Sequence, residues 1–185
     1  MTLEELFFSV MALGFESEGE ISTDFIFAAN RAQRMIFSEL SDELIARVNA
    51  DTLPVTDDFK EIDLASHISD VDSFTHAPES PSGAPIPGAR IIGGVLIIPK
   101  ATAGNIILRY KRVPKGIGID SPSEAIDIPR RAEYLLPVLT AAFFWLDDDE
   151  EKAAYYMSIY KTEAARLKSC GTPLSAAYYD TTGWA

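Results

Sequence analysis

The residues with the most evident chemical potential are five consecutive acids at 147–151, in the stretch "FFWLDDDEEKAAYYMSIY". Clustered carboxylates hold divalent cations when their oxygens converge on one point. Consecutive residues on a turn and a first helical turn point in divergent directions instead. The calcium-loop pattern D-x-[DN]-x-[DN]-G is also absent. The run therefore favours a helix start over a metal site.

As a helix start, the acids form a corner between two antiparallel helices, with Asp147, Asp148 and Asp149 as its capping residues. Asp147 or Asp148 is expected to accept backbone N–H bonds. Asp149 and the two glutamates after it then lie at the positive end of the helix dipole, where each contributes about 0.3–1 kcal/mol. The apolar stripe of the following helix is expected to pack back on the preceding one.

Other residues with catalytic potential are sparse. His67 and His76 fall in a loop-like region and are interpreted as solvated, and Cys170, the only cysteine, has no marked base partner. Neither a phosphate-binding glycine loop nor a G-x-S-x-G nucleophile motif occurs. We therefore predict no enzymatic activity, no catalytic residues, no bound metal and no cofactor.

The densest basic segment is "RYKRVPK", with Arg109, Lys111 and Arg112 on one predicted strand. The chain has a net charge of −12, and residues 1–75 carry 16 acids against 4 bases. The middle of the chain is thus the only place for a basic patch. Two interpretations stay open: a solvated strand face, or a contact with nucleic acid or an acidic partner.

The elements that position these residues follow from apolar periodicity. Helices are expected at residues 2–14, 22–50, 130–146 and 149–169. The second has a possible division at Ser41–Asp42, and Pro137 is expected to bend the third. Strands are expected within 59–64, 89–100 and 105–114, with the last two joined through "ATAG" as a hairpin. The predicted fold class is mainly α: a bundle of about four helices with an inserted β-hairpin or small sheet.

Four parts of the chain are expected. They are N-terminal helices (1–50), an inserted loop and β-hairpin region (51–118), a C-terminal helical pair (119–171) and an extended arm (172–185). The arm carries Leu174, Tyr178, Tyr179 and Trp184 without helical or alternating periodicity. We expect it to be disordered in the free subunit and to order on docking, and the alternative is a tail that folds back on its own bundle. The acidic N-terminus and the longest apolar run, residues 134–146, predict a soluble protein.

The C-terminal half resembles the head–tail connector, or adaptor, proteins of tailed bacteriophages. The resemblance rests on Tyr110, Arg112 and Pro114, the "IDIP" entry at 126–129, the Trp145–Asp149 corner and the tyrosine-rich helix after it. It covers about 65 residues closely, while the N-terminal helices agree in kind only. It implies a helical bundle with a β-hairpin inserted between its second and third long helices.

The resemblance also implies a function and partners. Such proteins form rings, typically of 12 subunits, beneath the portal protein and around the DNA channel. The C-terminal arm would bind the portal, with Leu174, Tyr178, Tyr179 and Trp184 as its anchors. Arg109, Lys111 and Arg112 would face the channel or a neighbouring subunit. The other partners would be a stopper or tail-completion protein and DNA passing non-specifically, with no membrane. The location would be the virion neck, and the host cytoplasm during assembly.

Two alternatives remain. One is a stopper or tail-completion protein of the neck, a class that is usually β-rich. The other, from a different class, is an acidic metal-dependent enzyme or a regulator that mimics DNA.

Overall fold

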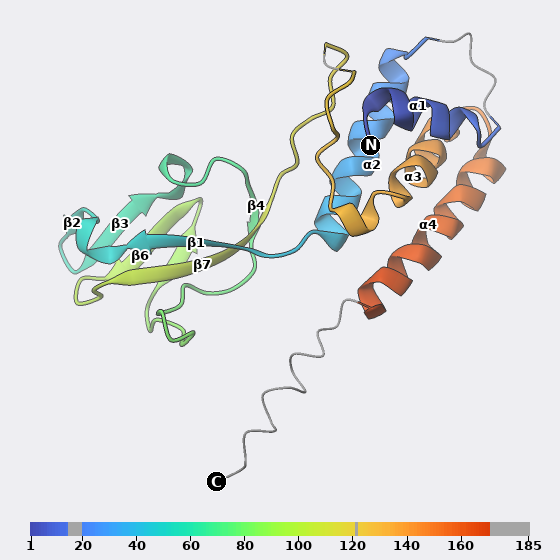
Figure 1. The fold of residues 1–185 in the computed structure, drawn as a ribbon. Coiled ribbons are helices and arrows are strands. Elements are labelled where there is room, and N and C mark those ends of the chain that lie inside the picture. The colour runs from blue at the N-terminus through green and yellow to red at the C-terminus, as the bar shows by residue number, and fades with distance from the viewer. Residues whose placement is uncertain (15–19, 121, 171–185) are drawn as a thin grey trace. The chain divides into compact units, whose positions relative to one another are not determined.

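The computed structural model describes residues 1–14, 20–120 and 122–170. The chain divides into two compact units (Figure 1). We call them the helical unit, formed by Met1–Leu40 and the chain from Lys115 onward, and the β unit, Ser41–Pro114. The helical unit is thus assembled from both ends of the sequence, and the β unit is one uninterrupted insertion.

The α-helices of the described residues all belong to the helical unit. They are α1 (Leu3–Met11), α2 (Thr23–Leu40), α3 (Leu135–Phe144) and α4 (Glu150–Cys170), preceded at α3 by the 3₁₀ turn η3 (Arg130–Ala132). A capping box of Thr2 and Glu5 starts α1, and the Ser22 hydroxyl accepts the backbone N–H of Phe25 at the start of α2. Helix α3 packs against both α2 and α4 (Figure 1).

The core of the helical unit is centred on α3. Leu135, Leu136 and Leu139 are fully buried, as an apolar helix between two others requires. The rings of Phe25 and Phe144 meet edge to face, with centroids 5.8 Å apart. From α4, Tyr160 enters the same core. Pro137 lies in the first turn of α3, where its missing N–H removes no intrahelical bond, so the predicted bend has no cause.

The β unit contains two antiparallel sheets, ordered β1-β7-β4 and β2-β3-β6-β5. The strands are β1 (Leu44–Asn49), β2 (Val55–Thr56), β3 (Phe59–Asp63), β4 (Val71–Phe74), β5 (Arg90–Ile92), β6 (Val95–Pro99) and β7 (Asn105–Arg112), with 3₁₀ turns η1 (Ala50–Thr52) and η2 (Leu64–Ser66) between them. Gly93 and Gly94 both have positive φ and join β5 to β6 in a tight hairpin. Apolar side chains of both sheets form a single second core.

The predicted fold class, mainly α, is wrong. The structure is 40% helical and 23% strand, with sheets of three and four strands, which is an α+β fold. Strands β2 and β4 form where no strand was predicted, and two further local errors contribute to the difference. Residues 44–49 form strand β1 and not the end of the second helix, which stops at Leu40. The predicted hairpin also does not form, because β6 pairs with β3 and β5 while β7 pairs with β1 and β4.

Two polar side chains of α2 fix the returning chain where it rejoins the helical unit. The Gln33 amide is fully buried and donates to the carbonyls of Lys115, at 3.0 Å, and Asp127, at 2.7 Å. One turn earlier, Asn30 both donates to the carbonyl of Ile117 and accepts its N–H. These bonds hold the segment that leads from the β unit into α3. Within the described residues, none of the helices is both long and apolar enough to cross a membrane.

Candidate functional site

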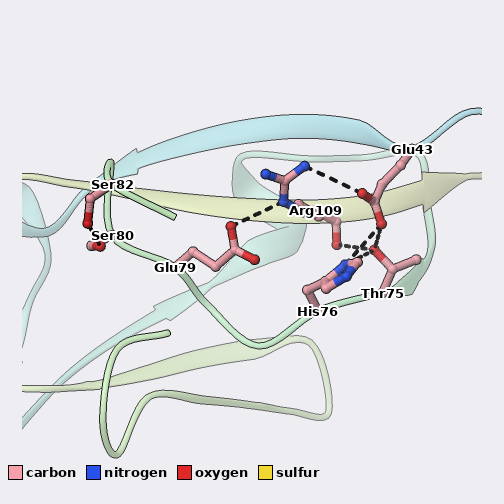
Figure 2. Close-up of polar contacts among 7 residues, drawn as sticks. All are labelled: Glu43, Thr75, His76, Glu79, Ser80, Ser82 and Arg109. Carbon is pink, nitrogen blue, oxygen red and sulfur yellow. Dashed lines mark hydrogen bonds and ion pairs between the residues drawn. The ribbon is translucent and has the colours of Figure 1, made fainter. Parts of the chain in front are cut away.

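A cluster of connected polar side chains lies on the sheet that contains β7. Figure 2 shows its members: Arg109 from β7, Glu43 just before β1, Thr75 and His76 just after β4, and Glu79 farther along the same segment. The cluster forms because β7 is the central strand and pairs with β1 on one side and β4 on the other. Backbone bonds from Thr75 N to Arg109 O and from Glu79 N to Ile107 O extend the second pairing beyond β4.

Arg109 is neutralised inside this cluster. Its Nε lies 3.1 Å from Oε2 of Glu79 and its Nη1 lies 3.6 Å from Oε2 of Glu43. The Glu79 side chain is only 11% exposed. The hydrogen bond and charge of Glu79, with a smaller contribution from Glu43, raise the pKa of Arg109. Because two carboxylates offset the charge of this guanidinium, its attraction to a phosphate is weak.

Glu43 is the second node of the cluster. Its carboxylate accepts a hydrogen bond from the Thr75 hydroxyl, and His76 Nδ1 lies 3.0 Å from Oε1. The Thr75 hydrogen bond is the main cause that lowers the pKa of Glu43. Burial opposes it, and the charges of His76 and Arg109 add to it. The histidine interpreted from the sequence as a solvated loop residue is therefore an exposed member of a polar network.

We call this network of Arg109, Glu43, Glu79, Thr75 and His76 the clasp. The carboxylate oxygens of Glu43 and Glu79 that make contacts in the cluster make them with side chains of the β unit. The Ser80 and Ser82 hydroxyls lie 2.8 Å apart and hydrogen-bond to each other (Figure 2). The clasp ties the segment after β4 to the beginning of β1 across the face of β7. It contains residues from three separate stretches of sequence, and the sequence identified only Arg109 in advance as a candidate binding residue.

The other two basic residues of the predicted group share strand β7 with Arg109. Lys111 stands opposite Ser73 of β4, and Arg112 stands opposite Val71. Both side chains are half-buried and make contacts of their own. Arg112 also lowers the pKa of Tyr110, although burial outweighs it and the pKa of that phenol is raised. The structure thus places the three bases on one strand but commits at least Arg109 to internal pairing.

At the acidic corner, the capping residue is Asp149. Its Oδ1 accepts the backbone N–H of Lys152 at 3.0 Å, while Asp147 and Asp148 are exposed on the turn. The Lys152 ammonium lies 3.7 Å from Asp149 Oδ2 and 3.9 Å from the centroid of the Trp145 ring. Among the described residues, no three histidine, cysteine, aspartate or glutamate side chains converge as metal ligands. The predicted arm residues Leu174, Tyr178, Tyr179 and Trp184 lie outside the described part of the chain.

Comparison with models of protein families gives no match, and comparison with curated proteins gives no significant match.

Proposed function

We propose that this chain is a structural subunit of the neck of a tailed bacteriophage. In this proposal it is a connector that assembles as a ring beneath the portal, extends the DNA channel and offers the tail its attachment surface. The observation that carries the proposal is the order of the units along the chain. The strands of the described residues, β1 to β7, all lie between α2 and α3 in the sequence, and α1–α2 and α3–α4 form one helical unit. The resemblance implies an insertion at this point.

Tyr110, Arg112 and Pro114 belong to the β unit, whereas the other residues that carry the resemblance have structural roles in the helical unit. Ile126 and Ile128 of the "IDIP" entry pack against its core, and Trp145 to Asp149 make the turn between α3 and α4. Tyr160 is 1% exposed. These positions specify how the helices meet.

The charge distribution suits a conduit for DNA. The net charge of −12 repels the phosphate backbone, and Arg109, the first residue of the densest basic segment, is neutralised by Glu43 and Glu79. A channel wall that holds DNA without binding it requires this balance. We accordingly favour the subunit and its neighbours, and not DNA, as the environment of the β7 bases. The arm at 172–185 remains the proposed portal-binding element.

The two antiparallel sheets favour one second candidate, the stopper or tail-completion protein. That class is usually β-rich, and the fold is α+β and not mainly α. The two candidates differ in their direct partner: a connector binds the portal itself, whereas a stopper binds the ring below the portal.

The test combines the purified chain with the portal protein of the same phage, with and without the remaining neck proteins. A connector co-sediments with the portal alone, and negative-stain images show an added ring. Twelve copies of a 20.3 kDa chain add about 240 kDa. Binding only after another neck protein is added would favour the stopper. A monomer that binds none of the neck proteins and has an activity dependent on divalent cations would overturn both the connector and the stopper proposals.

A further inference from the structure

The helical unit carries a groove that its own described residues leave unfilled. Two hollows, of about 340 and 390 Å³, share three lining residues, Arg31, Phe143 and Leu146, and we call them together the groove. Phe27 lines the first hollow and is 73% exposed, and Leu146 is 43% exposed. Large apolar side chains exposed together along a groove are typical of a docking site for another segment.

The groove also contains a cation without an acidic partner. The Arg31 guanidinium lies over the Phe143 ring, 4.2 Å from its centroid, and forms no ion pair with any residue in the described ranges. Asp24, Asp147, Asp148 and Glu150 stand around the rim. A segment that fits this groove places aromatic rings against its apolar side chains and one carboxylate beside Arg31. It also places N–H or O–H donors next to the acidic residues at the edge of the groove. A strongly acidic occupant would be repelled.

The chain itself contains a segment with this composition. Residues 171–185 include Tyr178, Tyr179 and Trp184, whose rings end in O–H or N–H donors, and a single charged residue, Asp180. The groove lies at the first turns of α4, about 30 Å along the helix from Cys170. A fully extended chain lets Trp184 lie up to about 46 Å from Cys170 and Asp180 up to about 33 Å from it. Both distances exceed the distance to the groove.

We propose that this groove receives residues 174–184 of the same chain, with Trp184 on Phe143 and Leu146 and the Asp180 carboxylate at Arg31. A tether of this length gives an effective concentration in the millimolar range, so weak contacts are enough to occupy the groove. The inference goes beyond the connector proposal and does not depend on it. If both are right, the groove holds the arm until the portal displaces it.

The experiment uses the full-length chain with Trp145→Phe, which leaves Trp184 as its single tryptophan. Acrylamide quenching of Trp184 should be several-fold weaker than for free tryptophan amide. Phe27→Asp should restore strong quenching. Phe8→Asp is the matched control, because Phe8 is 70% exposed but lies on α1 and does not line the groove. Arg31→Asp should release Trp184, and adding Asp180→Arg should recover protection.

Full quenching in the Trp145→Phe background, or equal effects of Phe27→Asp and Phe8→Asp, would overturn the proposal. Protection lost on dilution would assign the occupant to a second copy and overturn the same-chain assignment. Circular dichroism establishes that each variant folds, and Leu146→Ser serves as a milder groove variant. A second readout keeps Trp145 intact: the Met157 methyl resonance, from a residue that lines the groove, should shift when residues 174–185 are removed.

Discussion

Arg109 on β7 donates from Nε to Oε2 of Glu79 over 3.1 Å, and 30 residues separate the two in sequence. This bond joins the segment after β4 to the central strand of its sheet. Glu79 is also joined to β7 by its backbone, through reciprocal bonds with Ile107. The side-chain bond therefore reinforces a pairing that the backbone has already set.

Removing this acceptor should destabilise the β unit. Glu79→Ala should lower its free energy of unfolding by about 1–2 kcal/mol, because a charge-assisted bond is lost at a nearly buried position. Glu79→Gln keeps an oxygen acceptor and should cost less. Denaturant-induced unfolding of both variants measures their free energies of unfolding and shows which substitution costs more. Equal stability of Glu79→Ala and the unmodified chain would show that the clasp contributes nothing beyond its backbone bonds.

Acid should weaken the clasp through Glu43. The folded pKa of Glu43 is lower than its value of 4.5 without the cluster. A carboxylate with a depressed folded pKa stabilises the fold above its unfolded pKa and loses that contribution as the pH falls through the folded pKa. We expect stability to drop below about pH 4.5 and the drop to be shallower in Glu43→Gln.

The control for this titration is Glu61→Gln, which changes an exposed carboxylate on β3 outside the clasp. Melting temperatures between pH 3 and pH 7 give the comparison. The same acid dependence in Glu43→Gln and Glu61→Gln would remove Glu43 from the explanation.

The corner between α3 and α4 should depend on one acid of the five. Asp149→Ala should cost about 1 kcal/mol, because the N–H of Lys152 loses its acceptor. Asp148→Ala is the matched control, since Asp148 is exposed and its side chain makes no hydrogen bond to a residue in the described part of the chain. Calorimetry with and without Mg²⁺, Ca²⁺ or Mn²⁺ should give the same melting temperature. A rise of several degrees that Asp149→Ala abolishes would instead indicate a cation site.

Gln33 should be the most sensitive polar residue of the helical unit. Gln33→Leu leaves the carbonyls of Lys115 and Asp127 without their donor in a buried position, and should cost about 2–4 kcal/mol. Gln33→Glu turns a carboxylate toward the same carbonyls, so it should be worse at pH 7 than at pH 4, where the side chain can be protonated. Arg34→Leu, at the exposed neighbouring position, should have little effect. A well-tolerated Gln33→Leu would mean that other bonds fix the returning chain.

The helices were predictable because their signals are local. Apolar spacing marked α1, most of α2 and α4, and the acidic run marked the corner. The error at 44–49 has a physical cause. Leu44 and Val48 fit a helical stripe at spacing four, but with Ala46 they also fit the alternation of a strand. Pairing with β7, about 60 residues away, determines the outcome, and no local pattern contains that information.

The clasp was not predictable for the same reason. Glu43, Thr75 and His76 meet Arg109 only because β1 and β4 flank β7. The assignment of β6 and β7 to different sheets was equally absent from the local sequence, since both segments suit strands and the loop between them suits a hairpin. The two strands enter different sheets around one core, which a sequence of alternating apolar residues does not specify.

The insertion of the β unit has a consequence for synthesis on the ribosome. α1 and α2 emerge before any residue of α3 exists, and 74 residues of the β unit follow them. At about 5–20 residues per second, translation of this stretch takes about 4–15 s. Throughout that interval the apolar face of α2, with Phe25 and Ile36, has no α3 to cover it. Until its C-terminal helices are made, the nascent chain can cover this face only in part, through contacts such as that of Phe7 on α1 with Phe25.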